Sequence, residues 1–505
     1  MLKSSLLEII KTFDEEELMK FEDFLKSPYH NKITNVIKLF SEIKKYYPGF
    51  NNEELNKEFI WKKLFSEKEY NYGTMKNLIY ELTKLAMKFI VLEDFEGSIL
   101  EKDDILINCL NERKVTKHFN VKMSELERRY SKDSFNEEYF FVNDFYSSMS
   151  KILWMKIYHY RANNINAETE KDILDSSAMF IYSFLIYLFK YYNNVLIDSI
   201  DKNISMDRNI LAVFLKEISP EIIDKLLTIV KDHSERDFRV MSVFWNMSKS
   251  QQNNNSVKDY LEFKKSLFDN INIISRWDAR DLFHAMGNSL QNLDPSAIDI
   301  DKELLEISNT MLSTKIIFNR DPHSHELGNT LTTSDFNLYI WRAFNAGDYD
   351  AIANFTSKYL NKIPKDSMEY CKNISRAFLL FGERKFNEVL EIISISDHPN
   401  FITKVRMKHF KAKCLYELNE SDNFKNEFNS IYHFLKNNKS LSLKSKTDTK
   451  NLFDKINRMF RLKEKFDAFE YNKLKKEISE SSFSKTTWLN EKIKEFETNS
   501  KSKSR

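Results

Sequence analysis

Two short segments hold the histidines and acids best placed for chemistry. The segment DPHSHEL, 321–327, sets His323 and His325 two residues apart, beside Asp321 and Glu326. Two imidazoles at this spacing can share a metal ion on an extended backbone, but a third ligand must come from elsewhere in the chain. A polar connector is the favoured interpretation, so we expect no resident metal.

The segment RWDARDLFHAMGN, 276–288, places Asp281 and His284 on adjacent turns of one expected helix, within reach of Arg280. An acid that orients a histidine is a common general-base arrangement. No neighbouring residue supplies a nucleophile, however. We therefore expect ion pairing on a helix surface and no catalytic residue.

Positive charge is concentrated near the C-terminus. Residues 436–476 contain 13 Lys or Arg and 5 Asp or Glu, a net charge of +8, whereas the whole chain carries +2. Phosphates bind to such charge and bases stack on interleaved aromatic rings, here Phe460, Phe466, Phe469 and Tyr471. The same rings keep helical spacing, which also suits a core. Nucleic-acid binding through 436–476 is therefore the alternative function.

Several common kinds of enzyme are excluded by the glycine pattern. The seven glycines are too widely separated for GxGxxG, GxxxxGK or GxSxG, and HExxH does not occur. Ordinary dinucleotide, P-loop and α/β-hydrolase chemistry is thus ruled out, and we expect no cofactor. Cys109, Cys371 and Cys414 form no CxxC pair, which favours a reducing, cytoplasmic location over a disulfide framework.

One segment is almost entirely apolar: AMFIYSFLIYLF, 178–189. It lies between Asp175 and Lys190 and is shorter than the ~20 residues that a bilayer requires. A buried central helix is the favoured interpretation, and we expect no membrane association. A membrane or interface segment is the alternative.

The chain contains only seven glycines and seven prolines among 505 residues, against typical usage of about 7 % and about 5 %. So few turn formers predict long helices and an all-α fold. Thr12 followed by Glu15 has the spacing of a capping box, and Thr74 is a candidate cap for a later helix. Four short helices of this kind predict an N-terminal helical domain over 1–98.

The stretch FNAGDYDAIANFTSKYLNKIP, 344–364, has a recognisable layout. An expected helix, 334–346, leads into Gly347-Asp348-Tyr349, and a second expected helix closes at Pro364. This layout resembles a tetratricopeptide repeat. The resemblance implies a solenoid of helical hairpins, in which each hairpin buries its apolar faces against the next.

The layout recurs in weakened form. Phe386 lies 37 residues after Tyr349, and Phe424 lies 38 residues further on, against a family period of about 34. Small residues recur in the first helix of each expected hairpin: Ala343, Ala377 and Ala412. The sequence departs from the repeat at Ile352, where alanine is usual, and in lacking the early tryptophan. An irregular helical bundle is the alternative arrangement.

The chain as a whole is similar to a group of uncharacterised bacterial helical-repeat proteins. The residues that carry this likeness are KFEDFLKSPYHNK at 20–32, KKYYPGFNNEEL at 44–55, and CLYELNESDNF followed by FLKNNKSLS within 414–442. The resemblance implies a fold but no activity.

The expected fold is an α-solenoid of helical hairpins with an N-terminal helical domain. Its predicted sections are the N-terminal domain 1–98, a central helical array 99–325, tetratricopeptide-like repeats 326–440, basic helices 441–498 and a disordered tail 499–505.

Helical solenoids present a groove suited to a peptide or a protein, so we expect a non-enzymatic interaction scaffold. Asn337, Trp341 and Asn345, spaced at i, i+4 and i+8, are the expected partner-binding residues. The alternative for Trp341 is simple packing into the next hairpin.

Overall fold

The computed structural model describes residues 5–50, 55–130, 141–163, 165, 170–201, 206–253, 255–290, 293–294, 296–319, 328–395, 401–439, 441–479 and 486–503. Within these ranges the regular structure consists of helices, with no β-strand, which confirms the all-α prediction. The chain divides into two compact units. The first takes in the described residues up to Leu126, past the predicted boundary at residue 98, and the second takes in those from Glu127 onward.

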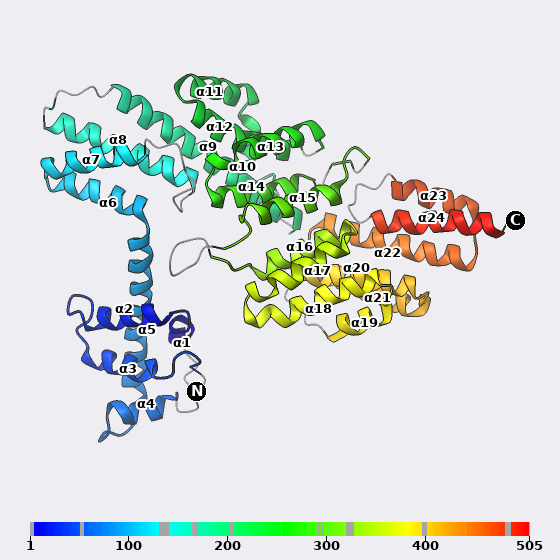
Figure 1. The fold of residues 1–505 in the computed structure, drawn as a ribbon, viewed down its shortest axis with the longest axis horizontal. Helices are drawn as coiled ribbons and strands as arrows, with labels where there is room; N and C mark the ends of the chain where they lie inside the picture. Colours follow the sequence, from blue (N-terminus) through cyan, green and yellow to red (C-terminus); the bar gives the residue numbers. More distant parts are fainter. Residues whose placement is uncertain are drawn as a thin grey trace. The chain divides into compact units, whose positions relative to one another are not determined.

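The first unit is a small helical domain (Figure 1). Its helices are α1 (Ser5–Ile10), α2 (Glu15–Lys26), α3 (Thr34–Lys44), α4 (Lys57–Leu64), α5 (Tyr72–Gly97) and α6 (Ile99–Glu112). Helix α7 (Thr116–Tyr130) crosses the boundary between the units. The core of the unit is aromatic: the ring of Phe21 lies 4.9 Å from that of Phe40 and 5.1 Å from that of Phe89. Aromatic contacts at these distances stabilise the fold beyond the apolar area that they bury.

Two helix starts differ from the sequence-based prediction. The capping box of α2 is formed by Asp14 and Glu17, because the Asp14 carboxylate accepts from the Glu17 N–H at 2.8 Å and the Glu17 carboxylate accepts from the Asp14 N–H at 3.1 Å. The prediction of Thr12 as cap is therefore wrong. Helix α5 is capped by Asn71, whose side chain accepts from the N–H of Thr74 at 2.9 Å. Thr74 lies inside the helix.

The second unit contains the remaining helices. Its first part comprises α8 (Val142–Ala162), α9 (Glu170–Asp201), α10 (Ile210–Glu217), α11 (Pro220–His233), α12 (Glu235–Gln252), α13 (Val257–Asn270), α14 (Arg276–Ser289) and α15 (Ile300–Ser313). Its second part comprises α16 (Thr333–Asn345), α17 (Tyr349–Tyr359), α18 (Lys365–Gly382), α19 (Phe386–Ile395), α20 (Phe401–Glu417), α21 (Ser421–Asn437), α22 (Leu443–Glu464), α23 (Ala468–Ser479) and α24 (Thr486–Lys503). Helix α24 extends into the segment 499–505 that the sequence predicts to be disordered.

Neighbouring helices pack in chain order through much of this unit (Figure 1). Helix α8 packs along α9, and α12 packs against α9, α11 and α13. In the second part α16 contacts both α17 and α18, and α20 contacts both α21 and α22. Helices next to each other in sequence therefore bury one another's apolar stripes.

Three turns between these helices share one backbone geometry. Gly347, Arg384 and Asn419 have φ values of 74°, 62° and 59°, in the left-handed region. In each turn the next N–H donates to the carbonyl five residues earlier at 2.9 Å, from Asp348, Lys385 and Glu420 respectively. Such bonds satisfy carbonyls left over at a helix C-terminus. The recurrence of one turn gives the three hairpins a common layout.

The small residues predicted at the hairpin crossings are buried. Ala343, Ala377 and Ala412 are at most 1 % exposed. Gly382 serves the same close packing, because a Cβ atom at this position would lie 2.7 Å from the ring of Tyr349. Close packing in the hairpins thus depends on the three alanines that the sequence indicated and on Gly382, which it did not.

Candidate functional site

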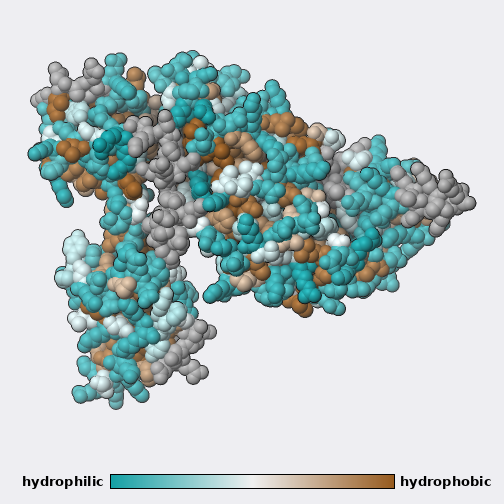
Figure 2. All heavy atoms as spheres, in the orientation of Figure 1, coloured by the Kyte–Doolittle hydropathy of each residue, from teal (hydrophilic) through white to brown (hydrophobic). Residues whose placement is uncertain are grey.

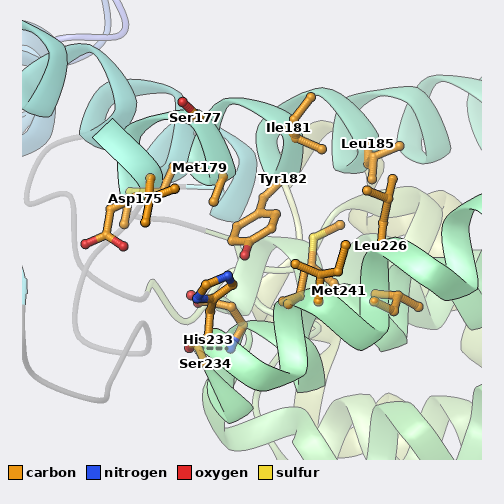
Figure 3. Close-up of a pocket in the computed structure, with 16 residues that line it drawn as sticks. Asp175, Ser177, Met179, Ile181, Tyr182, Leu185, Leu226, His233, Ser234 and Met241 are labelled. Atoms are coloured by element: carbon orange, nitrogen blue, oxygen red, sulfur yellow. Dashed lines mark hydrogen bonds between the residues drawn. The ribbon is translucent and has the colours of Figure 1, made fainter. Parts of the chain in front are cut away.

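A groove lies between α9 on one side and α11 and α12 on the other (Figure 3). Its volume is about 280 Å³, close to the lower end of the ~300–1,000 Å³ of ligand pockets. Its apolar lining comprises Leu174, Ala178, Met179, Ile181, Tyr182, Leu185, Leu226, Leu227, Ile229, Val230 and Met241.

The α9 wall of the groove comes from a helix that is apolar on most of its circumference. Tyr182, Ile186 and Phe189 are buried, and to that extent the prediction of a buried helix over 178–189 is confirmed. Phe180 and Phe184, however, are 64 % and 43 % exposed. One face of α9 is therefore core, and the next face presents large apolar side chains beside the groove.

Among the helices that the structure describes, one stretch is long and apolar enough to cross a bilayer by length and composition. It is Glu170–Ile197 within α9, and 39 % of its most apolar window is buried inside the protein. In the view of Figure 2 hydrophilic residues cover most of the surface, with apolar patches among them.

The opposite wall comes from α11, which begins with proline at its first turn, where the missing N–H has no intrahelical partner. Ile223, Leu227 and Val230 recur on one stripe and are buried. Ile222 and Ile229 extend the apolar surface outward and are 54 % and 46 % exposed. The helix therefore carries a broader apolar surface than its own packing uses.

One end of the groove is polar and acidic. Asp175, His233, Ser234 and Asp237 lie there, as Figure 3 shows for the first three. The Asp237 carboxylate accepts a 2.6 Å hydrogen bond from the hydroxyl of Tyr146. Ser234 caps α12 by accepting from the Asp237 N–H at 3.2 Å. These bonds fix the acidic end in place.

Burial at this end of the groove shifts the pKa values of its ionisable groups. It raises the pKa of Asp175, with Asp172 and Asp237 acting in the same direction and Lys171 and His233 opposing. It also raises the pKa of Tyr182 to about 12, with the two nearby carboxylates adding to the effect. A cation placed here would relieve the repulsion between the carboxylates. The groove therefore suits an apolar ligand with one basic group.

The three residues predicted to bind a partner lie on α16, and all are half-buried. The ring of Trp341 lies 5.6 Å from that of Phe378 on α18, and the Arg406 guanidinium carbon lies 5.7 Å from it. The Asn337 side chain accepts from the Cys371 thiol at 3.6 Å. Asn345 lines a second pocket, described below. Trp341 packs against the next hairpin, and a role of the three residues in partner binding stays a prediction.

Asp281 and His284 do not pair with each other. His284 Nε2 lies 3.7 Å from a carboxylate oxygen of Asp335 on α16, which Arg280 also binds. Asp281 instead lies 3.9 Å from the ammonium of Lys190 on α9. Arg280 and Asp281 therefore form ion pairs, but with partners from other helices, and His284 lies beside Asp335 and not beside Asp281.

Burial lowers the pKa of His284 to about 4; Asp335 opposes the shift, and Arg342 and Arg280 reinforce it. Between about pH 6.5 and about pH 4 the unfolded chain therefore binds a proton that the folded chain does not. We therefore expect His284 to cost no free energy of unfolding above about pH 6.5. Below that pH the free energy of unfolding should fall as the pH falls toward about 4. Since 32 % of the side chain is exposed, solvent moderates the effect.

His284→Gln should flatten the loss of stability between pH 7 and pH 4.5, measured as the urea midpoint of the second unit. The matched control is His433→Gln, at an exposed position on α21. It should keep the slope of the original protein. A slope unchanged by His284→Gln would show that this histidine is not the group responsible.

The basic segment 436–476 forms much of α22 and α23. Phe460 and Tyr471 are buried, as expected of core residues, whereas Phe466 and Phe469 are 50 % and 76 % exposed. Arg458 is engaged by the carboxylates of Glu470 and Glu477. Nucleic-acid binding by this segment stays a prediction.

The histidines of DPHSHEL, 321–327, lie outside the described residues. Across the part of the chain that the structure describes, no group of three or more His, Cys, Asp or Glu side chains could hold a metal ion.

Comparison with known proteins adds no assignment: no family model, curated protein or solved structure matches the chain.

Proposed function

We propose that the protein is a non-enzymatic interaction scaffold whose groove between α9, α11 and α12 holds the apolar face of a helix from a partner protein. The observation that carries this proposal is the pair of facing apolar walls, both of which continue into exposed side chains. Ile181 on α9 is 39 % exposed and Ile229 on α11 is 46 % exposed. Large apolar surfaces of this kind mark sites of interaction.

The dimensions favour a short helical anchor. Two or three apolar side chains at i, i+3 or i+4 and i+7 fill a groove between two helices. Each fully buried side chain contributes about 1.5–3 kcal/mol, so three contribute on the order of 5–9 kcal/mol before the cost of association. That cost is at least about 4 kcal/mol, so at most about 5 kcal/mol remains and we expect dissociation constants of about 0.1 mM or weaker.

The acidic end orients the partner. A Lys or Arg about one helical turn beyond the apolar anchors would reach Asp175 and Asp237, and a basic residue at the other end would not. Because the Asp237 carboxylate is already held by Tyr146, it offers a preorganised acceptor, and less entropy is lost on binding.

We further propose that α16–α21 form a tetratricopeptide-like solenoid. What supports this is the shared turn at Gly347, Arg384 and Asn419, with small buried residues in the first helix of each hairpin. Such an array would give the scaffold a second, extended binding surface, which includes the predicted residues of α16.

The groove is tested with peptides selected against the full-length protein from a displayed library of amphipathic helices. Ile229→Glu should weaken binding of the selected peptides at least tenfold, because a buried, unpaired charge is costly. The matched control is Leu261→Glu on α13, at a residue 48 % exposed and outside the groove lining. It should bind as the original protein does.

Selected peptides should also carry a basic residue after their apolar anchors and lose affinity when it becomes glutamate. Peptides that bind equally well to both variants would place the interaction elsewhere. Binding of the protein to neutral lipid vesicles, lost in Ile229→Glu, would instead make the groove a membrane-contact surface.

A further inference from the structure

A second pocket lies at the turn between α16 and α17, where α15, α18, α20 and α24 also meet. Its volume is about 120 Å³, well below the ~300–1,000 Å³ of pockets for drug-sized ligands. Its lining comprises Asp301, Phe344, Asn345, Ala346, Gly347, Tyr349, Phe381, Lys413, Trp488 and Glu491. The space suits a ligand of a few heavy atoms.

Lys413 is the unusual member of this lining. Its side chain comes from α20 and is only 6 % exposed. The ammonium lies 5.6 Å from the ring of Phe344 and 5.6 Å from the ring of Trp488. Across the described residues it forms no ion pair within 4.0 Å and no hydrogen bond. Buried charges are normally paired, so this ammonium has donors available to a ligand.

Two carboxylates, those of Asp301 and Glu491, line the same pocket. Neither forms an ion pair with Lys413, although both act on it through space. The nearby carboxylate of Glu417 is already engaged, since it accepts from Trp488 Nε1 at 2.8 Å and pairs with Lys492 at 2.8 Å. The pocket thus brings one cation and two carboxylates together, with no ion pair between the cation and either carboxylate.

This charge pattern selects among small ligands. A simple anion that reached Lys413 would be repelled by the two carboxylates, and a simple cation that reached the carboxylates would be repelled by Lys413. A ligand with an anionic and a cationic group on adjacent atoms satisfies both. The aromatic walls would contact any short aliphatic part of such a ligand.

We propose that this pocket binds a small free α-amino acid, with its carboxylate on the ammonium of Lys413 and its own ammonium directed to Asp301 and Glu491. The proposal is independent of the groove between α9 and α11, because the two pockets share no residue.

Burial lowers the pKa of Lys413 to about 8, against the opposing pull of Asp301 and the other nearby acids. Near pH 8 a large fraction of the side chain is therefore neutral in the free protein. A bound carboxylate favours the charged form. Binding at pH 8 should consequently take up a proton from solution, up to about half a proton per site.

The test is isothermal titration calorimetry of the full-length protein with L-alanine at pH 8, in two buffers of different ionisation enthalpy. The expected result is binding with proton uptake. Acetate and methylammonium each carry one of the two charged groups and should bind at least tenfold more weakly. Lys413→Met, which keeps the length of the side chain, should abolish both the binding and the uptake.

Glu491→Gln is a second variant for the same test. Glu491 is exposed, so this substitution should leave the fold intact. It should weaken L-alanine severalfold, and binding should still take up protons, because Lys413 is retained and loses one of the carboxylates that raise its pKa. The proposal is overturned if L-alanine gives no binding heat, if acetate binds as tightly as L-alanine, or if binding survives both substitutions.

Discussion

Phe378→Ala is expected to lower the free energy of opening α16, α18 and α20 by about 3–5 kcal/mol. Phe378 is 1 % exposed and joins three helices. Its ring stacks on Phe344 at 4.5 Å and meets Phe410 at 4.9 Å and Trp341 at 5.6 Å. Alanine leaves a cavity whose rigid walls cannot close fully, and the aromatic contacts are lost with it.

Hydrogen exchange measures this effect best, because the full chain has two compact units and a single unfolding energy would mix them. Amides of α16, α18 and α20 should exchange much faster in Phe378→Ala, and those of α2 and α5 should not change. The control is Phe469→Ala, at a residue 76 % exposed, which should alter protection by less than about 0.5 kcal/mol. Equal effects of the two substitutions would contradict the packing described.

Asp278→Ala is expected to destabilise the contact of α8 and α9 with α14 by about 3–5 kcal/mol. Asp278 is fully buried. Its carboxylate accepts from the backbone N–H of Val142 at 2.7 Å and from the Ser275 hydroxyl at 2.7 Å, and it pairs with Lys190 at 2.7 Å. Removing it leaves a poorly solvated ammonium and a buried N–H without their acceptor.

The size of this effect is checked with a double-mutant cycle that adds Lys190→Met. The two single variants should each be strongly destabilised, and the double variant should be more stable than the sum of their effects predicts. Lys190 also lies 3.1 Å from the side-chain oxygen of Asn143, so Lys190→Met keeps some cost of its own. Additive effects would show that the buried pair contributes no coupling.

The sequence predicted the helical hairpins best where a glycine marks the turn. Gly347 stands at a left-handed position, which glycine occupies at no steric cost. The equivalent turns place Arg384 and Asn419 at positive φ. These residue types predict a left-handed turn less clearly than glycine does. The two later hairpins were indicated by the aromatic spacing of 37 and 38 residues and by Ala377 and Ala412.

The helix caps show a different limit. Thr12 and Thr74 are residues of a suitable type close to the true starts, yet Asp14 and Asn71 make the capping bonds. Acidic and amide side chains cap at least as well as threonine, so type and spacing alone did not decide between neighbouring candidates.

Neither pocket was predictable from local sequence. The apolar run 178–189 indicated a buried helix, but its packing leaves Ile181 and Phe184 on an open face. Lys413 is one basic residue among 77, and only tertiary packing buries it between two rings. His284 likewise lies beside Asp335 of another helix. The nearby Asp281 lies beside Lys190 of a third helix.

The most direct test of the scaffold function is hydrogen exchange of the full-length protein with and without a selected peptide. We predict slower exchange on α9 near 174–185 and on α11 near 222–233, with the Ile229→Glu variant showing no change. Protection confined to α16 around Trp341, or to the basic segment 436–476, would contradict binding in the groove and move the site to that surface.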